Sequence, residues 1–288
     1  MPSPELLAFN SEALARKPFL SSNYDPVAVR AALFAAPSSR ISAWKEERAG
    51  SALIEWRGTE KSSRVIMLVA GGGFCFPAGD GHRALLDRLC GHLNGSGALV
   101  HHRLAPEHAF PSAHEDIVAA LVHLLEAPGI QRLDIVADSS GASLVLTALA
   151  ALQGHVRNLP QRCTFLSPLT DLAMTGLSHV TNCEQDPMFG PQAIIHKSWH
   201  YLQGANPTDR RASPFWGDAA GLPPMLLIAG STETMLDDTL RYADKVNAAG
   251  GSARTSIYEA APHVFPLIEG LPEAGQAFDE ICAFLSAP

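Results

Sequence analysis

Val136-Ala137-Asp138-Ser139-Ser140-Gly141-Ala142 joins an apolar, β-branched run to a run of small, helix-forming residues. A serine held at a sharp turn between a strand and a helix is typical of a nucleophile elbow, which projects the serine oxygen from the end of a sheet. The two backbones then pass so closely that the positions two before and two after the serine must be small. Ala137 and Gly141 meet this demand. An ordinary polar turn would also fit the stretch alone, so the interpretation depends on partners elsewhere.

Short apolar runs alternate with helical segments from residue 64 onward. We expect strands at 65–70, 99–102, 133–137, 164–167, 225–229 and 255–258. Helices are expected at 82–93, 113–126, 141–153, 237–249 and 272–286. This alternation predicts an α/β fold with a mostly parallel sheet covered by helices on both faces. Two earlier strands, 41–46 and 52–57, alternate apolar and polar residues as edge strands do.

Two segments fall outside that alternation. Residues 1–40 show helical spacing but cannot form a core by themselves. More than fifty residues separate the strands 164–167 and 225–229, and they include a helix at 191–203. A structureless loop of that length would be unusual in a compact domain. We therefore interpret the interval as an inserted helical piece that joins the N-terminal helices as a lid.

Composition limits the classes of partner. The 288 residues are 47% hydrophobic and 17% charged, with a net charge of −8, which argues against nucleic acid or an anionic membrane as partner. Five scattered cysteines fit reduced thiols better than a disulfide framework or a zinc site. Neither a secretory signal nor an apolar run of transmembrane length is evident, so a cytoplasmic location is expected.

The elbow serine needs a base and an acid. In the doubly wound hydrolase fold these follow in the order serine, acid, histidine, each after a strand. His263 lies directly after the last expected strand, whereas most of the other histidines end a strand or fall on helices. Glu233 is the first acid after the preceding strand, with Asp237 as the alternative. Asp237 and Asp238 sit at a helix start, where carboxylates also serve as caps.

A glycine loop supplies the third requirement, a site for the negative charge that develops on the carbonyl oxygen. Ala70-Gly71-Gly72-Gly73-Phe74 follows the first long apolar strand. Glycines let backbone N–H groups approach such an oxygen closely. No phosphate-binding pattern is completed here, so a phosphate cradle is the less favoured interpretation.

With these residues in view, the chain resembles the hormone-sensitive-lipase family of carboxylesterases, within the α/β-hydrolase superfamily, over nearly its whole length. The glycine loop is similar to the family's H-G-G-G-F loop, and residues 137–141 are similar to its G-D-S-A-G elbow. Further similar blocks are Arg103-Leu104-Ala105-Pro106-Glu107-His108, Ser167-Pro168-Leu169-Thr170-Asp171-Leu172, Asp186-Pro187, Glu233-Thr234-Met235-Leu236-Asp237 and Pro262-His263-Val264-Phe265.

The resemblance implies Ser139 as nucleophile, His263 as base and Glu233 as acid. It also implies an oxyanion hole formed by the backbone N–H groups of three residues, Gly72, Gly73 and Ser140. Residues 1–40 would be N-terminal cap helices, and 41–288 the catalytic domain with a cap insertion at about 180–212. Family dimers often form through the last strand and its neighbouring helix, so a homodimer is expected.

Three positions depart from the family pattern. Ala70 replaces the loop histidine, Ala137 replaces the first elbow glycine, and His102 stands where tyrosine is usual. The first departure leaves the oxyanion loop looser or reflects a different substrate. None of the three removes the triad.

The sequence therefore predicts a serine esterase that needs no cofactor or metal and hydrolyses small to medium carboxylic esters through an acyl-enzyme. A lactone hydrolase, an acyltransferase or a hydroxynitrile lyase would use the same triad. A non-catalytic small-molecule receptor is the alternative from another class. His263 argues against it, because receptors on this fold have lost the catalytic histidine.

Overall fold

An eight-stranded sheet forms the centre of the described part of the protein, in the order β1-β2-β4-β3-β5-β6-β7-β8. The computed structural model describes residues 1–20, 24–34, 43, 45–60, 62–156 and 158–287. The strands are β1 (Lys45–Ala49), β2 (Ala52–Gly58), β3 (Arg64–Val69), β4 (Ser96–His101), β5 (Arg132–Asp138), β6 (Arg162–Leu166), β7 (Met225–Gly230) and β8 (Ala253–Tyr258). The pairings of β2 with β1 and β4 are antiparallel, and all others are parallel. The mostly parallel α/β sheet predicted from the sequence is confirmed.

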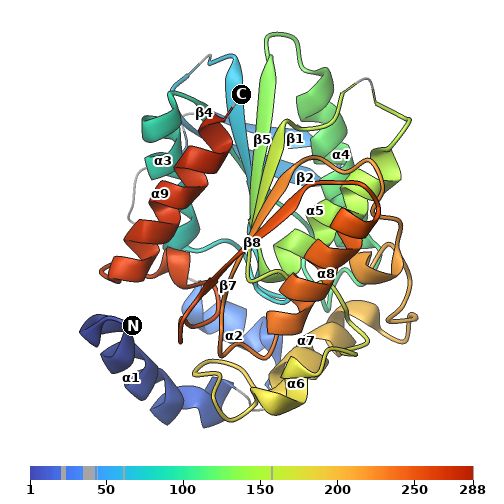
Figure 1. Ribbon diagram of the computed structural model, residues 1–288. Coiled ribbons are helices and arrows are strands. Elements are labelled where there is room, and N and C mark those ends of the chain that lie inside the picture. The colour runs from blue at the N-terminus through green and yellow to red at the C-terminus, as the bar shows by residue number, and fades with distance from the viewer. Residues whose placement is uncertain (21–23, 35–42, 44, 61, 157, 288) are drawn as a thin grey trace.

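Helices cover both faces of this sheet. Figure 1 shows α3 (Asp80–Leu93) and α9 (Pro272–Ser286) on one side. The other side carries α4 (Ser112–Glu126), α5 (Ser139–Leu152) and α8 (Leu236–Ala248). This two-sided covering explains why β3 and β7 are almost wholly apolar, since neither of their faces meets water. Along the described ranges, no helix combines the length and the apolar composition needed to cross a membrane.

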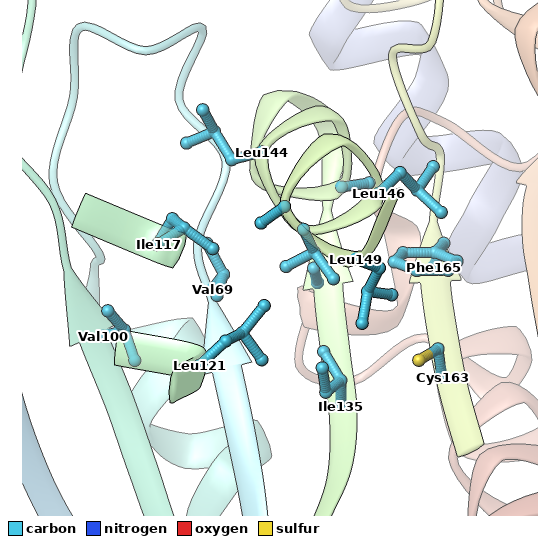
Figure 2. Close-up of a cluster of buried hydrophobic side chains, with 14 of the residues drawn as sticks. Val69, Val100, Ile117, Leu121, Ile135, Leu144, Leu146, Leu149, Cys163 and Phe165 are labelled. Atoms are coloured by element: carbon cyan, nitrogen blue, oxygen red, sulfur yellow. The ribbon is translucent and has the colours of Figure 1, made fainter. Parts of the chain in front are cut away.

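The larger core lies between the sheet and the α4–α5 side. In Figure 2, Leu149 of α5 points toward Ile135 of β5 and lies beside Phe165 of β6, and the same buried cluster contains Leu144, Leu146 and Val69. All six side chains are fully buried. Burying a leucine or phenylalanine side chain stabilises the fold by roughly 1.5–3 kcal/mol. This packing fixes α5, and therefore the elbow at its start, against the sheet.

The remaining helices gather at one end of the molecule, as Figure 1 shows: α1 (Pro4–Leu20), α2 (Pro26–Leu33), α6 (Ser178–Thr181) and α7 (Pro191–Leu202). Lys17 of α1 donates hydrogen bonds to the carbonyl oxygens of Cys183 and Asp186. Arg30 of α2 donates to the carbonyl oxygens of Cys75 and Ala105. The N-terminal helices thus contact both the long interval after β6 and the body of the protein.

Three strand predictions need correction. The first strand begins at Lys45 rather than residue 41, and residues 41, 42 and 44 lie outside the described part of the chain. β2 is not an edge strand, because it pairs with β1 on one side and β4 on the other. Its charged residues Glu55 and Arg57 are buried. The edge strand at the far end is β8, which was expected to be a buried strand but is half exposed.

Candidate active site

Ser139 is the first residue of α5 and directly follows β5. Its φ of +49° lies in the left-handed region, the strained conformation that a nucleophile elbow requires. The turn brings α5 so near to β3 that a Cβ on Gly141 would lie 2.4 Å from the carbonyl oxygen of Val69. Ala137 is buried within the sheet. The close strand–helix approach predicted from residues 137–141 is therefore present.

The fold brings Ser139, His263 and Glu233 together although they are far apart in the sequence. The Oγ of Ser139 lies 3.0 Å from Nε2 of His263, and Nδ1 of the same ring lies 2.8 Å from Oε2 of Glu233. Their exposed fractions are 9%, 6% and 0%, respectively. A carboxylate at Nδ1 holds the proton there and leaves Nε2 to accept one from the serine hydroxyl.

Glu233 is held by two further donors. Its Oε1 accepts hydrogen bonds from the hydroxyl of Ser167, at 2.8 Å, and from the backbone N–H of Gly230, at 2.6 Å. The Ser167 oxygen in turn accepts the N–H of Val264, beside His263, at 2.9 Å. Ser167 therefore links the acid loop to the histidine loop. Sequence reasoning gave Ser167 no role, although its place after β6, beside the strand that leads to Glu233, was a usable signal.

The alternative acids have other partners. Asp237 accepts the backbone N–H of Ser178 at 3.0 Å. Asp238 accepts the N–H groups of Thr170 and Asp171 at 2.7 and 2.8 Å. Both carboxylates lie in the first turn of α8, as expected, but they tie that helix to the segment after β6. Of the two candidate acids, only Glu233 lies beside the His263 ring.

The glycine loop after β3 has a conformation that few other residues adopt. Gly72 and Gly73 have φ values of +106° and +61°. The loop is held from the elbow side, since Gly71 N–H donates to Asp138 Oδ1 at 3.0 Å and Phe74 N–H donates to the Ser140 hydroxyl at 3.1 Å. In the part of the chain that the structure describes, no acceptor is bonded to the N–H of Gly72 or Gly73. The first turn of a helix likewise leaves the N–H of Ser140 without an intrahelical acceptor.

His82 contacts the same assembly, although sequence reasoning placed it on a helix and gave it no role. Its Nδ1 accepts the N–H of Gly79 at 3.1 Å, so the ring proton is on Nε2. That nitrogen lies 3.1 Å from Oδ1 of Asp138 and donates to it. Asp138 thus accepts hydrogen bonds from both His82 and Gly71.

A cavity of about 200 Å³ opens onto Ser139 and His263. It is smaller than the roughly 300–1,000 Å³ typical of sites for drug-sized ligands. The Phe189 ring forms one wall and meets the His263 ring edge-on, with 5.1 Å between centroids. The other apolar side chains in the lining are Phe74, Leu169, Met188, Ile194, Met235, Val264 and Leu267. Gly72, Gly73 and four polar side chains, those of His82, Asp138, Lys197 and Ser198, also line the cavity.

Two titratable side chains near this cavity have shifted pKa values. Burial lowers the pKa of Lys197, which lines the cavity from α7, to about 8. Burial raises the pKa of the Cys75 thiol to about 12. Cys75 is therefore a neutral, weakly nucleophilic thiol at neutral pH, whereas Lys197 remains largely cationic.

Comparison with known proteins gives a consistent set of relatives. Residues 66–267 match the model of a family described by its alpha/beta hydrolase fold. The chain is 34% identical to an acetyl-hydrolase of Streptomyces hygroscopicus, over 82% of this chain and 80% of that protein. An esterase of Acinetobacter venetianus is 31% identical, over 81% and 78%. The crystal structure of an esterase from the bacterial hormone-sensitive lipase family aligns with a TM-score of 0.88 at 30% identity, over 99% of this chain and 98% of the other.

Proposed function

The chain belongs to the hormone-sensitive-lipase family of α/β-hydrolase carboxylesterases, and on that premise we propose that Ser139, His263 and Glu233 are its catalytic triad. The observation that carries the proposal is the unbroken series of contacts from the Ser139 hydroxyl through His263 to Glu233, beneath an apolar cavity. The substrates proposed are small to medium carboxylic esters.

In the first half of the reaction, Ser139 Oγ attacks the ester carbonyl while Nε2 of His263 takes the hydroxyl proton. The Glu233 carboxylate stabilises the imidazolium that forms and keeps the ring in its productive orientation. His263 then gives the proton to the leaving alcohol, and an acyl-enzyme remains. In the second half, water attacks the acyl carbonyl with His263 again acting as base, and the carboxylic acid leaves as Ser139 regains its proton.

The oxyanion hole proposed for this reaction consists of the N–H groups of Gly72, Gly73 and Ser140. Two of them belong to the glycine loop and the third to the first turn of α5, whose helix dipole also favours negative charge at that end. Fixed donors aimed at developing charge are among the largest contributions to catalysis, because they need no reorganisation during the reaction.

The small cavity supports short acyl or alcohol groups. We propose that residues 1–40 and about 180–212 form a cap over the catalytic domain at 41–288. The hydrogen bonds from Lys17 of α1 to the 183–186 segment support this division. We also propose a homodimer through β8 and the adjacent α8.

The test is Ser139→Ala, assayed with p-nitrophenyl acetate and butyrate. Loss of the nucleophile lowers kcat by roughly a thousandfold or more. Ser252→Ala, at an exposed serine away from the site, serves as the control and keeps wild-type rates. Wild-type activity in Ser139→Ala would overturn the assignment.

A fluorophosphonate probe separates the esterase from a binding module. The wild-type enzyme acquires a covalent label at Ser139, and Ser139→Ala does not. Products formed with and without an added acceptor alcohol distinguish hydrolysis from acyl transfer. A panel that includes lactones tests whether cyclic esters are substrates as well.

A further inference from the structure

Helix α7 presents three side chains to the cavity, those of Ile194, Lys197 and Ser198. Their spacing of three and four residues places them on one face of the helix. Ile194 matches the apolar lining of the cavity, whereas Lys197 and Ser198 are polar. Neither polar residue has a part in the proposed triad chemistry, so their presence in this wall needs a separate explanation.

The stem of Lys197 packs across the glycine loop. A Cβ on Gly73 would lie 2.4 Å from Cδ of Lys197, so a side chain at Gly73 would collide with this stem. The ammonium nitrogen is 4.3 Å from the centre of the Phe189 ring, which contacts His263 edge-on. The stem of Lys197 therefore lies against the proposed oxyanion loop, and its positive charge lies over the ring beside the proposed base.

That charge lacks a counter-ion in the described part of the chain. The Lys197 ammonium contacts the Phe189 ring, but no carboxylate lies within ion-pair distance of it. A cation in an apolar cavity is unfavourable without a partner. With a pKa of about 8 the side chain is still mainly charged at pH 7, and an anionic ligand group would supply the missing partner.

Ser198 provides a second, independent observation. Its side chain is 4% exposed, and its Oγ is buried without a hydrogen-bond partner among the described residues. Buried hydroxyls almost always have a partner, so an unsatisfied one in a cavity wall points to an absent ligand. A hydroxyl and an ammonium on adjacent residues can both donate to one group of oxygen atoms.

We propose that Lys197 and Ser198 form a subsite for a carboxylate carried by the substrate, so that the preferred esters are small and anionic. The inference rests on the proposed esterase function and adds a substrate class to it. The Asp138 carboxylate, which also faces the cavity, already accepts hydrogen bonds from Gly71 and His82. Lys197 thus remains the charged group available to pair with the substrate.

The test compares anionic esters with neutral esters of the same shape. Monoethyl succinate is paired with ethyl 4-oxopentanoate, which places the carboxylate on the acyl side. The pair 3-acetoxypropanoate and 4-acetoxy-2-butanone places it on the alcohol side. Wild-type enzyme is expected to show a higher kcat/KM for the anionic member of at least one pair, and the pair that responds identifies the side.

Variants assign that preference to the subsite. Lys197→Met lowers the anionic-to-neutral ratio of kcat/KM roughly tenfold or more, the scale of a lost charge-assisted hydrogen bond. Lys197→Arg restores part of the ratio, and Ser198→Ala lowers it less than Lys197→Met does. Lys245→Met is the matched control, because Lys245 also lies over a phenylalanine ring, that of Phe215, but does not line the cavity.

Two results would overturn the subsite. One is a wild-type ratio at or below unity for both pairs, and the other is a ratio unchanged in Lys197→Met and Ser198→Ala. In either case, Ser139-dependent hydrolysis of the neutral esters would leave the proposed esterase function intact. If wild-type enzyme hydrolysed neither these four esters nor p-nitrophenyl acetate and butyrate, the proposed function itself would fail.

Discussion

Ala70 occupies the place of the family's loop histidine, and its methyl group cannot form the hydrogen bonds of an imidazole. In this chain the Asp138 carboxylate holds the glycine loop through Gly71 N–H, while His82 donates to the same carboxylate oxygen. His82 is itself fixed by the N–H of Gly79. The position of the proposed oxyanion donors therefore depends on the Asp138–His82 pair.

Replacing His82 should thus affect turnover more than substrate binding. We expect His82→Leu to lower kcat roughly tenfold with little change in KM, since a misplaced loop weakens stabilisation of the transition state. His82→Gln retains a donor and should recover part of kcat. Steady-state kinetics with p-nitrophenyl butyrate measure both constants.

His92→Leu is the control for this experiment. His92 lies on the same helix but is exposed and contacts Phe278. A His82→Leu enzyme with wild-type kcat, or one in which only KM changes, would contradict the positioning role.

Ala137 and Gly141 show how far a local pattern predicts geometry. The elbow pattern predicts that both residues are small, but the structure makes the two demands unequal. A Cβ at Gly141 would collide with the Val69 carbonyl oxygen, whereas the methyl group of Ala137 is accommodated within the buried sheet. Ala137 is therefore compatible with the elbow, and of these two positions only Gly141, two residues after the serine, requires glycine.

At the scale of elements, β2 shows why alternating apolar and polar residues wrongly predicted an edge strand. Its charged residues predicted a face in water, yet Glu55 is buried against Arg57, Arg83 and His101. Arg83 reaches β2 from α3, and His101 from the neighbouring β4. A pattern of alternating residues cannot distinguish a charged side chain in water from a buried one whose partners are distant in the sequence.

This ion-pair cluster predicts a pH-dependent stability. Burial alone would raise the Glu55 pKa, but hydrogen bonds from His101, Arg83 and Arg57 outweigh it and hold the pKa well below the ordinary value. The folded state therefore binds fewer protons than the unfolded state. The stabilisation is fully present above the ordinary glutamate pKa of about 4.3 and is lost as the pH falls below it.

Glu55→Gln should accordingly lower the free energy of unfolding by about 1.5–3 kcal/mol at pH 7, because it removes the carboxylate that accepts from Arg57, Arg83 and His101, while Arg57 keeps its second partner, Asp87. The gap in Tm between wild type and variant should narrow as the pH falls from 5 to 3. Thermal unfolding followed by circular dichroism measures it. Glu46→Gln, on the exposed part of β1, is the control. A Tm difference between wild type and Glu55→Gln that stays constant with pH would contradict a stabilising role for the ionised Glu55 carboxylate.

At the scale of the whole molecule, the carboxyl ends of the parallel strands explain why much of the proposed site was predictable. The register pairs Val69 with Ala137 and Gly230 with Tyr258, so the loops after β3, β5, β7 and β8 meet at the carboxyl end of the sheet. Chain order alone therefore indicated Ser139, Glu233 and His263. Lys197 and Ser198 were not predictable, because periodicity does not orient a helix in the irregular interval toward a distant loop.

The edge of the sheet at β8 leads to the last prediction. Only β7 pairs with β8 in the described sheet, so one side of β8 has an open row of backbone N–H and C=O groups, and Ile257 on this strand is 39% exposed. Such an edge favours pairing with another strand, and a twofold axis would let β8 of two copies pair with each other. We expect the wild-type protein to sediment as a dimer.

Ile257→Lys tests that interface directly. A charge on an edge strand opposes strand pairing, so we expect this variant to sediment as a monomer and to keep its esterase activity, since Ile257 does not line the cavity. Val180→Lys, at an exposed apolar residue of α6, should leave the dimer intact. Sedimentation velocity at several micromolar concentrations distinguishes the states. A monomeric wild type, or a dimeric Ile257→Lys, would contradict assembly through β8. In such a dimer the introduced lysines of both copies would lie on the two paired β8 strands and oppose their pairing.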